Sequence, residues 1–336
     1  MSRVAIIGAG AWGTSLAIAL ARKRIHEICV WAHEREVVES ITIRRVNEMF
    51  LPGFELPDSI QATHDLQAAL QDAEIVVSVM PSQHCRTLFE HVAPRLREGA
   101  LVVSCTKGLE ASTLSRMTEV IEDVLRKLHL TPRVGALSGP SFAKEVARGD
   151  PTAVTVASVD GELARIVQDA FNSSRFRVYT NDDVIGVELG GALKNVIAIA
   201  AGVCDGLGLG HNSIAALITR GLAEIARLVN ACGGRLDTMA GLAGLGDLVL
   251  TCTGDLSRNR TVGVELGKGR KLPDIIRGMH GAVAEGVFTT KAAVGLARKR
   301  DVEMPITEQM FAILEQGKAP QQAIEELMTR AAKSEV

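Results

Sequence analysis

The chain has 336 residues, with 37 Lys or Arg against 39 Asp or Glu and a formal net charge of −2. This balance excludes a general binder of nucleic acids or anionic membranes, because such proteins carry a basic excess or a basic run. Only 3% of the residues are aromatic and 47% are hydrophobic, which indicates an aliphatic core and excludes a stacking platform for nucleic acid. At about 150 residues per domain, the length predicts two domains.

Short apolar runs alternate with helical patterns in the first half of the chain. Strands are predicted at 3–7, 28–32, 74–80, 100–105 and 133–137, with helices among them at 11–24, 83–96 and 112–128. This alternation indicates a parallel sheet with helices on both faces, which runs at 152–158 and 176–179 are expected to extend. The uncharged stretch at 4–21 is long enough for a signal peptide or a membrane span. Its three glycines and the absence of a preceding basic segment favour strand, turn and helix instead.

The strand signals stop near residue 181. The rest reads as helices separated by glycine-rich joints at 205–212 and 240–247. We therefore expect a Rossmann-type, doubly wound, mostly parallel α/β sheet domain at 1–187 that binds a dinucleotide. An all-helical domain at 188–336 is expected to bind substrate and to carry the catalytic residues.

The six cysteines are scattered along the chain, with no Cys-x-x-Cys pair and no Cys/His cluster at zinc spacing. No structural metal is predicted. Four of the cysteines lie in apolar runs, which is typical of buried free thiols in the reducing cytoplasm.

A glycine-rich turn follows the first predicted strand. Gly8, Gly10 and Gly13 form the pattern Gly-x-Gly-x-x-Gly at the start of a helix. Gly8 permits the tight turn, Gly10 lets a pyrophosphate approach the backbone, and Gly13 allows the helix to pack closely on the strand. The pattern predicts a dinucleotide site, and a purely structural turn in an unrelated α/β protein is the alternative.

The end of the second predicted strand bears on the choice between NAD and NADP. An acidic residue at the strand tip would bind the ribose 2′-hydroxyl of NAD, but the segment 31–35 has none there and carries His33 and Arg35. These two side chains can face a 2′-phosphate, so NADP is expected to be accepted as well as NAD. Alternatively, both are ordinary surface residues.

A single charged residue interrupts the most apolar helical stretch. Between residues 189 and 204, Lys194 is the only charged residue and Asn195 the only amide. A lysine with apolar neighbours on every helical face cannot easily reach bulk water, so its charge is expected to point into a cavity. There it can polarise a carbonyl and donate a proton while a nicotinamide supplies hydride. A snorkelling or structurally paired lysine is the alternative.

Polar residues that suit a phosphate group follow at 246–260. Asp247 and Thr251 are four residues apart and share one helical face. Ser257, Arg258 and Asn259 stand at the start of the next predicted helix, where a guanidinium and free helix amides would bind a phosphate. A Ser257 N-cap with an exposed Arg258 is the alternative.

Two loops leave the predicted sheet at its carboxyl edge, where ligands bind in open α/β folds. One loop carries Lys107, and the other carries Gly139 and Ser141. Both loops are expected to complete the cleft, although either could be structural.

Six motifs, in this order, resemble the bacterial NAD(P)-dependent glycerol-3-phosphate dehydrogenase family: GAGAWGTSLA, SCTKGLE, SGPSFAKEV, ELGGALKNVIAIAAGVCDGLGLGHNS, AGLGDLVLTC and SRNR. Together they extend over most of the chain and are more specific than any one alone. The resemblance implies hydride transfer between NAD(P)(H) and the pair sn-glycerol 3-phosphate and dihydroxyacetone phosphate. It further implies that the reduction supplies glycerophospholipid synthesis. With the apolar carboxy-terminal helices, it favours a homodimer that is not stably inserted in a membrane.

The resemblance also implies individual roles. Lys194 matches the proton donor and acceptor, and the catalytic candidates are Lys194, Lys107, Asp247, Asn195 and Thr251. The expected substrate contacts are Lys107, Gly139, Ser141, Lys194, Asp247, Ser257, Arg258 and Asn259. The expected cofactor contacts are Gly8, Gly10, Ala11, Trp12, Gly13, His33, Lys107, Ala143, Arg258, Val283 and Glu285. Ala11 stands where a Ser is common, which leaves only its backbone amide for a phosphate.

Two other functions fit part of this pattern. A two-domain dehydrogenase of hydroxy acids would need a carboxylate site in place of the SRNR segment. A non-catalytic NADP sensor would keep the glycine turn but has no use for the isolated charge of Lys194.

Overall fold

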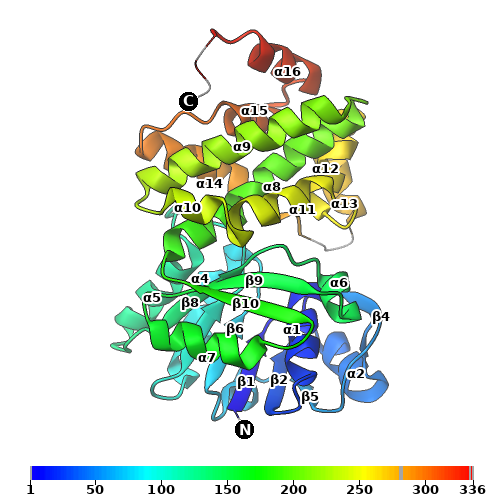
Figure 1. Cartoon of the computed structure of the whole chain (residues 1–336). Coiled ribbons are helices and arrows are strands. Elements are labelled where there is room, and N and C mark those ends of the chain that lie inside the picture. The colour runs from blue at the N-terminus through cyan, green and yellow to red at the C-terminus, as the bar shows by residue number, and fades with distance from the viewer. Residues whose placement is uncertain (1, 280–282, 333, 335–336) are drawn as a thin grey trace.

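The computed structural model describes residues 2–279, 283–332 and 334, and it places a sheet region below a helical region (Figure 1). Eight strands form one sheet in the order β10–β9–β8–β7–β6–β1–β2–β5, and all neighbours are parallel except the antiparallel pair β8 and β9. The strands are β1 (Ser2–Ile7), β2 (His26–Trp31), β5 (Ile60–Thr63), β6 (Ile75–Ser78), β7 (Leu101–Ser104), β8 (Val134–Ser138), β9 (Thr152–Ala157) and β10 (Phe176–Asn181). A small antiparallel pair, β3 (Val46–Asn47) and β4 (Leu51–Glu55), lies outside this sheet.

Helices cover both faces of the sheet because each face carries its own apolar core. Residues of α1, α2, α6 and α7 join one core, and residues of α3, α4 and α5 join the other. The helices of the sheet region are α1 (Ala11–Ala21), α2 (Arg35–Arg44), α3 (Leu66–Leu70), η1 (Ser82–His84), α4 (Cys85–Val92), η2 (Ala93–Arg95), α5 (Met117–Lys127), α6 (Ala143–Arg148) and α7 (Gly161–Phe171). The expected doubly wound, mostly parallel sheet is confirmed.

The helical region follows β10 directly. Its elements are α8 (Val184–Gly206), α9 (His211–Ala231), α10 (Leu236–Met239), the π-helical turn η3 (Leu242–Gly246), α11 (Asp247–Thr253), α12 (Arg258–Gly267), α13 (Leu272–Gly278), α14 (Glu285–Lys299), α15 (Pro305–Gln316) and α16 (Pro320–Met328). No strand lies in the described part of this region, as the loss of strand signals predicted.

Helix α8 lies in the middle of the helical region and packs against α9, α11, α12, α14 and α15. It is long and apolar enough to cross a membrane by composition, but 89% of its most apolar window is buried inside the protein, as expected for a core helix. Small residues bring α12 against it: a Cβ at Gly202 would lie 2.0 Å from the carbonyl oxygen of Arg260, and one at Gly263 would lie 2.0 Å from that of Ile199. The backbones of α8 and α12 therefore touch, which fixes the start of α12 relative to Lys194.

Several predicted boundaries were wrong. The helix expected at 112–128 begins at Met117, because Leu109 and Arg116 pair across a tight loop before it. The helix expected at 11–24 ends at Ala21, because the chain turns into the left-handed conformation at Arg24 (φ 56°). Strands β3, β4 and β5 were missed because they are short and carry polar residues. The stretch 4–21 is strand, turn and helix, as predicted.

All six cysteines are free thiols. Five are buried, and Cys232 is half-buried. Burial raises the pKa of the Cys105 thiol to about 12, so it stays protonated at neutral pH. These thiols act as small apolar core side chains.

Candidate active site

The glycine turn joins β1 to α1 and has the geometry of a dinucleotide site. Gly8 has φ +122°, and a Cβ there would lie 2.0 Å from the carbonyl oxygen of Val79. A Cβ on Gly13 would lie 1.9 Å from the carbonyl oxygen of Gly8, so the helix packs on the turn at van der Waals distance. Gly10 is different, because no described atom lies within 4 Å of the position of its Cβ.

Gly10 is therefore not required by the fold, and it keeps the surface beside the α1 N-terminus open. No side chain caps this N-terminus. Its free amides and the positive end of the helix dipole suit a pyrophosphate, and a residue larger than glycine would fill the cradle. The residues present thus fit a dinucleotide.

The other expected cofactor residues lie in two groups. Ala11 and Trp12 form the first turn of α1, and the indole Nε1 of Trp12 is buried without a partner among the described residues. The hydroxyl of Ser15 donates to the carbonyl of Ala143 at 2.7 Å, which attaches the start of α6 to α1. His33 is exposed just after β2, and its ring contacts that of Trp31 at 6.2 Å between centroids.

The second group lies at the start of α14. Both carboxylate oxygens of Glu285 are bound by Ser82, one by its amide at 3.0 Å and the other by its hydroxyl at 2.6 Å. Burial raises the pKa of Glu285, while these hydrogen bonds and the charge of Arg258 oppose the shift. Val283, half-buried, lies in the segment just before α14. The sequence did not point to Ser82, which begins η1 four residues after the end of β6.

The cluster around Lys194 is built from three separate segments, the Lys107 loop, α8 and α11. Asp247, at the start of α11, binds both lysines: its Oδ2 accepts from Lys107 Nζ at 2.7 Å, and its Oδ1 lies 3.0 Å from Lys194 Nζ. Thr251, one turn later, accepts from Lys194 Nζ at 2.6 Å and donates to the carbonyl of Asp247 at 2.6 Å. The expected shared helical face of Asp247 and Thr251 is confirmed.

The two ammonium groups differ in how many of their hydrogens are already bound by protein groups. Lys107 Nζ donates to Asp247, to the carbonyl of Gly139 at 2.9 Å and to the hydroxyl of Ser141 at 3.4 Å, which uses all three of its hydrogens. Lys194 Nζ has only Asp247 and Thr251 as partners among the described residues. One hydrogen of Lys194 is therefore available to a ligand, whereas Lys107 is already held in place.

Burial controls the proton of Lys194. The residue is 5% exposed, and burial lowers the pKa of its ammonium from 10.5 to about 8. Asp247 opposes this shift, and the positive charge of Lys107 adds to it. The group is thus charged at neutral pH but releases its proton far more readily than a surface lysine, as a proton donor and acceptor requires.

A chain of amides links the two regions beside this cluster. Asn195 Nδ2 donates to the carbonyl of Lys107 at 3.3 Å, and Asn195 Oδ1 accepts from Asn259 Nδ2 at 2.9 Å. Asn259 Oδ1 in turn accepts from the amide of Gly286 at 2.9 Å. Both asparagines therefore hold α8, α12, α14 and the Lys107 loop together.

The start of α12 has features of both structures considered for the SRNR segment, the phosphate site and the Ser257 N-cap. Ser257 is the N-cap of the helix, and its hydroxyl accepts from the amide of Arg260 at 3.2 Å. Arg258 is exposed and has no hydrogen bond or ion pair among the described residues. Desolvation by the surrounding protein nevertheless lowers its pKa, against the charge of Glu285. A guanidinium that binds no carboxylate among the described residues is suited to an anionic ligand.

The turn before Asp247 was interpreted only as a glycine-rich joint. It is the π-helical turn η3, in which the amide of Gly246 donates to the carbonyl of Gly241 at 3.1 Å. Such turns occur frequently at functional sites, and this one delivers Asp247 to the lysines. Among the residues with described placement, no group of three or more His, Cys, Asp or Glu could hold a metal ion.

The chain is similar to known proteins over nearly its whole length. The family profiles described as NAD-dependent glycerol-3-phosphate dehydrogenase N-terminus and C-terminus match residues 3–164 and 183–325. A glycerol-3-phosphate dehydrogenase (NAD(P)+) of Koribacter versatilis is 66% identical, over 100% of this chain and 99% of that protein. The crystal structure of the glycerol-3-phosphate dehydrogenase of Coxiella burnetii is 41% identical, with a TM-score of 0.93 over 98% of this chain and 99% of that one. The enzyme of Saccharomyces cerevisiae is 28% identical, with a TM-score of 0.81 over 96% and 98%.

A Rossmann-type sheet with an open glycine turn, followed by a helical region that buries a lysine beside a carboxylate, is the arrangement expected of a nicotinamide-dependent dehydrogenase. The matches to known proteins identify the family within this class of dehydrogenases. The chain belongs to the NAD-dependent glycerol-3-phosphate dehydrogenase family. As a member of it, the chain is an NAD(P)-dependent oxidoreductase that interconverts sn-glycerol 3-phosphate and dihydroxyacetone phosphate.

Proposed function

We propose that the enzyme works mainly as a reductase of dihydroxyacetone phosphate, with Lys194 as general acid, and that its product supplies glycerophospholipid synthesis in the cytoplasm. The free hydrogen of Lys194 carries this proposal, since it is the one donor in the lysine cluster without a partner among the described residues. When bound, the reduced nicotinamide supplies the hydride that reaches the carbonyl carbon. Lys194 Nζ gives its proton to the carbonyl oxygen, and the alcohol forms.

The remaining residues of the cluster prepare this step. Asp247 keeps the two ammonium groups together in a buried site, which like charges would otherwise resist. Lys107, held by Gly139 and Ser141, adds positive potential where negative charge develops on the substrate oxygen. Asn195 and Thr251 fix the lysines from the helical region.

The phosphate of the substrate is assigned to the start of α12. The guanidinium of Arg258 has no hydrogen-bond or ion-pair partner among the described residues, and Asn259 is the next residue in the chain. The hydroxyl oxygen of Ser257 already accepts a hydrogen bond as the helix cap, so this side chain can contribute to phosphate binding only by donating its hydrogen. On the cofactor side, Gly8, Gly10, Ala11, Trp12 and Gly13 are assigned to the pyrophosphate, and His33 to the ribose end of NAD or NADP. Ala143, Val283 and Glu285 complete the set.

The division of labour follows the chain. We assign most of cofactor binding to residues 1–187, with Val283 and Glu285 added from the other part, and catalysis to residues 188–336. Helix α8 nevertheless begins at Val184, and its first turn packs on β8 and β9. The two parts share the site, because Lys107 comes from the first and Lys194 from the second.

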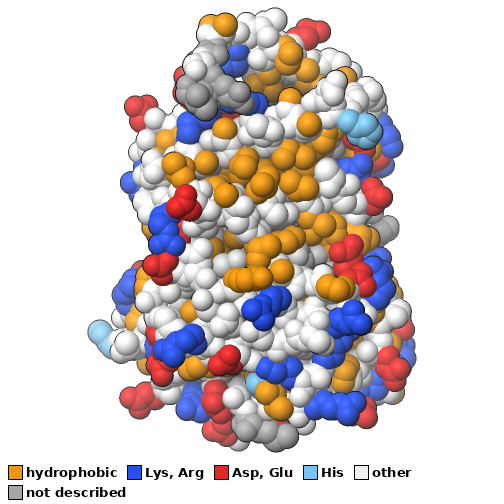
Figure 2. All heavy atoms as spheres, in the orientation of Figure 1, with side chains coloured by type: hydrophobic (Ala, Val, Ile, Leu, Met, Phe, Trp, Pro, Cys, Tyr) orange, Lys and Arg blue, Asp and Glu red, His pale blue; other side chains and the backbone are white. Residues whose placement is uncertain are grey.

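A second copy of the chain is assigned to the face of α9. Figure 2 shows apolar side chains gathered in a band over this helix, and Ile214, Leu217, Ile218 and Leu222 lie half-buried along one stripe of it. Leu245 and Val249 add exposed apolar surface, 38% and 41% exposed. An apolar stripe of this kind favours a homodimer, which light scattering on the purified protein measures.

The catalytic assignment is tested by Lys194→Ala. Turnover in dihydroxyacetone phosphate reduction should fall about a hundredfold or more, the usual effect of losing a general acid, while the dissociation constant for NADPH changes less than about twofold. Arg258→Ala should instead raise the Michaelis constant for dihydroxyacetone phosphate. Unchanged turnover in Lys194→Ala would overturn the role of this lysine, and unaltered substrate saturation in Arg258→Ala would show that the phosphate binds elsewhere.

A further inference from the structure

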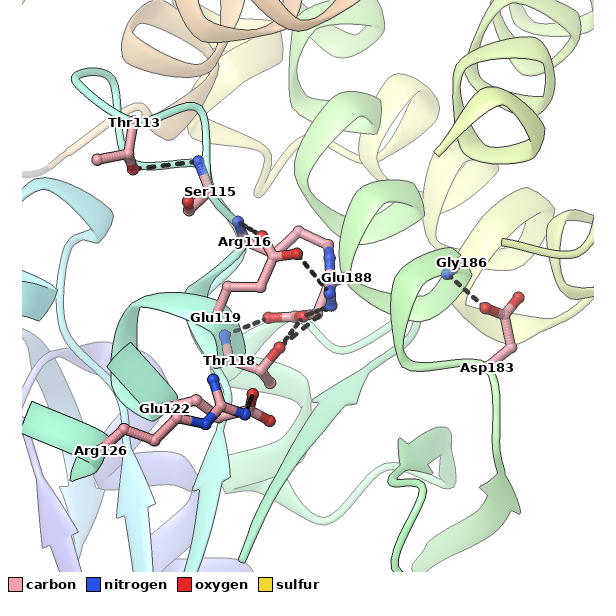
Figure 3. A network of polar contacts seen from close by, with 10 residues as sticks. All are labelled: Thr113, Ser115, Arg116, Thr118, Glu119, Glu122, Arg126, Asp183, Gly186 and Glu188. Carbon is pink, nitrogen blue, oxygen red and sulfur yellow. Dashed lines mark hydrogen bonds and ion pairs between the residues drawn. The ribbon is translucent and has the colours of Figure 1, made fainter. Parts of the chain in front are cut away.

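Helix α8 buries a second charged residue, Glu188, which lies six residues before Lys194 and contacts the N-terminus of α5. Its side chain is 5% exposed. Figure 3 shows it reaching the N-terminus of α5, where its Oε1 accepts from the amide of Thr118 at 2.9 Å and its Oε2 accepts from the Thr118 hydroxyl at 2.5 Å. A carboxylate at this end of a helix meets free amides and the positive end of the dipole. Glu188 thus completes a helix that belongs to the sheet region.

Arg116 closes the contact. It is the N-cap residue of α5, and its guanidinium donates to Glu188 at 2.6 Å and to Glu119 at 2.8 Å. Burial raises the pKa of Glu188, and the charge of Arg116 and the Thr118 hydrogen bonds oppose this shift. A buried ion pair contributes little net stability compared with apolar packing, but it accepts only one geometry. The ion pair between Arg116 and Glu188 therefore fixes the position of α5 relative to α8.

That position is transmitted to Lys107. The segment from Lys107 to Arg116 is a closed loop: Leu109 pairs with Arg116, and the amide of Glu110 donates to the carbonyl of Ser115 at 3.0 Å. Arg116 therefore anchors one end of a loop whose other end carries the ammonium bound to Asp247.

The same face of α8 contacts the loop at three levels. Glu188, Gly191 and Asn195 lie at positions i, i+3 and i+7, which is one stripe of a helix. A Cβ at Gly191 would lie 3.7 Å from Lys107 Cγ, and Asn195 binds the Lys107 carbonyl. Lys194 is the neighbour of the last of these residues, so the stripe sets where the two lysines stand relative to each other.

We propose that Glu188 is a positioning residue for the reaction: by holding Arg116 and the N-terminus of α5, it keeps the Lys107 loop in register with α8, so that Lys107 and Lys194 share Asp247. This inference rests on the proposed roles of the two lysines. It assigns Glu188 no contact with substrate or cofactor.

The chain contains a matched control for this residue. Glu224 on α9 is also buried, 2% exposed, and also binds the N-terminus of another helix. It accepts from the amide of Ile306 at 2.6 Å and from the amide and hydroxyl of Thr307, both at 3.2 Å. Both of its helices lie in the helical region, and the contact does not involve the Lys107 loop. Loss of the Glu224 carboxylate therefore perturbs a buried helix cap without disturbing the lysines.

The test compares Glu188→Gln with Glu224→Gln in the full-length enzyme. Each variant is measured for Tm, NADPH dissociation constant, Michaelis constant for dihydroxyacetone phosphate, kcat and the pH profile of kcat. Both substitutions should lower Tm. Glu188→Gln should also lower kcat about tenfold or more, because small misplacements of catalytic groups have effects of this size, whereas Glu224→Gln should leave kcat within about twofold.

The pH profile separates positioning from simple loss of stability. Asp247 and Lys107 are the charged groups that act on Lys194, and the charge of Lys107 lowers the pKa of Lys194. The neighbouring Cys252 thiol stays protonated in this range, because burial raises its pKa to about 12. If Lys107 moves off Asp247, the pKa of Lys194 rises, and the alkaline limb of kcat should move to higher pH in Glu188→Gln only. Equal kcat and equal limbs in the two variants would overturn the proposal.

If Glu188→Gln does not fold, Arg116→Lys gives the same information, because it keeps the charge and loses the forked geometry. It should lower kcat and move the limb in the same direction, and wild-type values would again overturn the proposal. The result is independent of Lys194→Ala: unchanged turnover in that variant contradicts the general acid, whereas wild-type behaviour of Glu188→Gln contradicts only the positioning role.

Discussion

The glycine turn and the lysine cluster, which we assign to one active site, are built in opposite ways. The turn consists of backbone, and its three glycines lie within six residues at the start of α1. The cluster consists of charged and polar side chains from segments between Lys107 and Thr251, and Asp247 is the one carboxylate among the described residues that binds both ammonium groups. A substitution in the turn should therefore act through sterics on binding, and one in the cluster through electrostatics on turnover.

The largest effect is expected at Asp247. Asp247→Asn leaves two buried ammonium groups side by side without a counter-charge, so Lys194 should lose its proton and kcat should fall about a hundredfold or more. Asp247 is 1% exposed, and water therefore cannot replace its charge. Steady-state reduction of dihydroxyacetone phosphate at pH 7 measures the loss. Asp255→Asn, which removes an exposed partner of Arg260, is the control and should behave like wild type. Near-normal kcat in Asp247→Asn would show that the lysines do not depend on it.

A smaller, purely steric effect is expected in the turn. Gly13→Ala forces α1 away from Gly8, which costs about 1–3 kcal/mol of stability and should weaken NADPH binding about tenfold or more. Gly10→Ala meets no described atom, so it should weaken NADPH binding while leaving Tm unchanged. Gly161→Ala, also in open space but far along the chain on α7, controls for the added methyl group. Fluorescence titration with NADPH and thermal unfolding measure both quantities. A Gly10→Ala variant that binds NADPH with normal affinity would contradict the assignment of the pyrophosphate to this turn.

The effect that is smallest at neutral pH is a graded dependence of turnover on pH. Because burial lowers the pKa of Lys194 to about 8, the lysine is protonated below this pH and neutral above it. Reduction needs the protonated form, so its kcat should be constant at lower pH and fall about tenfold per pH unit above 8. Oxidation of glycerol 3-phosphate needs the neutral form and should rise through the same range. Turnover measured in both directions between pH 6 and 10 checks this, and a reduction rate that stays level to pH 10 would contradict it.

Much of the cluster could be foreseen from local patterns. Lys194 stood out because it is the only charge in a long apolar stretch, and its burial is confirmed. Thr251 was placed with Asp247 by helical spacing, also correctly. The role of Asp247 as the bridge between two lysines had no such signal, because Lys107 lies 140 residues away in the sequence. Glu188 was missed for the same reason: its partners, Arg116 and Thr118, precede it by about 70 residues on another element.

Local sequence alone was enough for the features that depend on local physics. The alternation of apolar runs determined a parallel sheet, the spacing of three glycines determined the turn, and the end of the strand signals determined where helices take over. Only the tertiary structure decided which charges meet, that Lys107 is fully bound while Lys194 keeps a free hydrogen, and that Glu188 caps a helix of the other region. Periodicity and backbone conformation act over a few residues, whereas a buried charge finds its partner through packing, which brings together segments that the sequence keeps far apart.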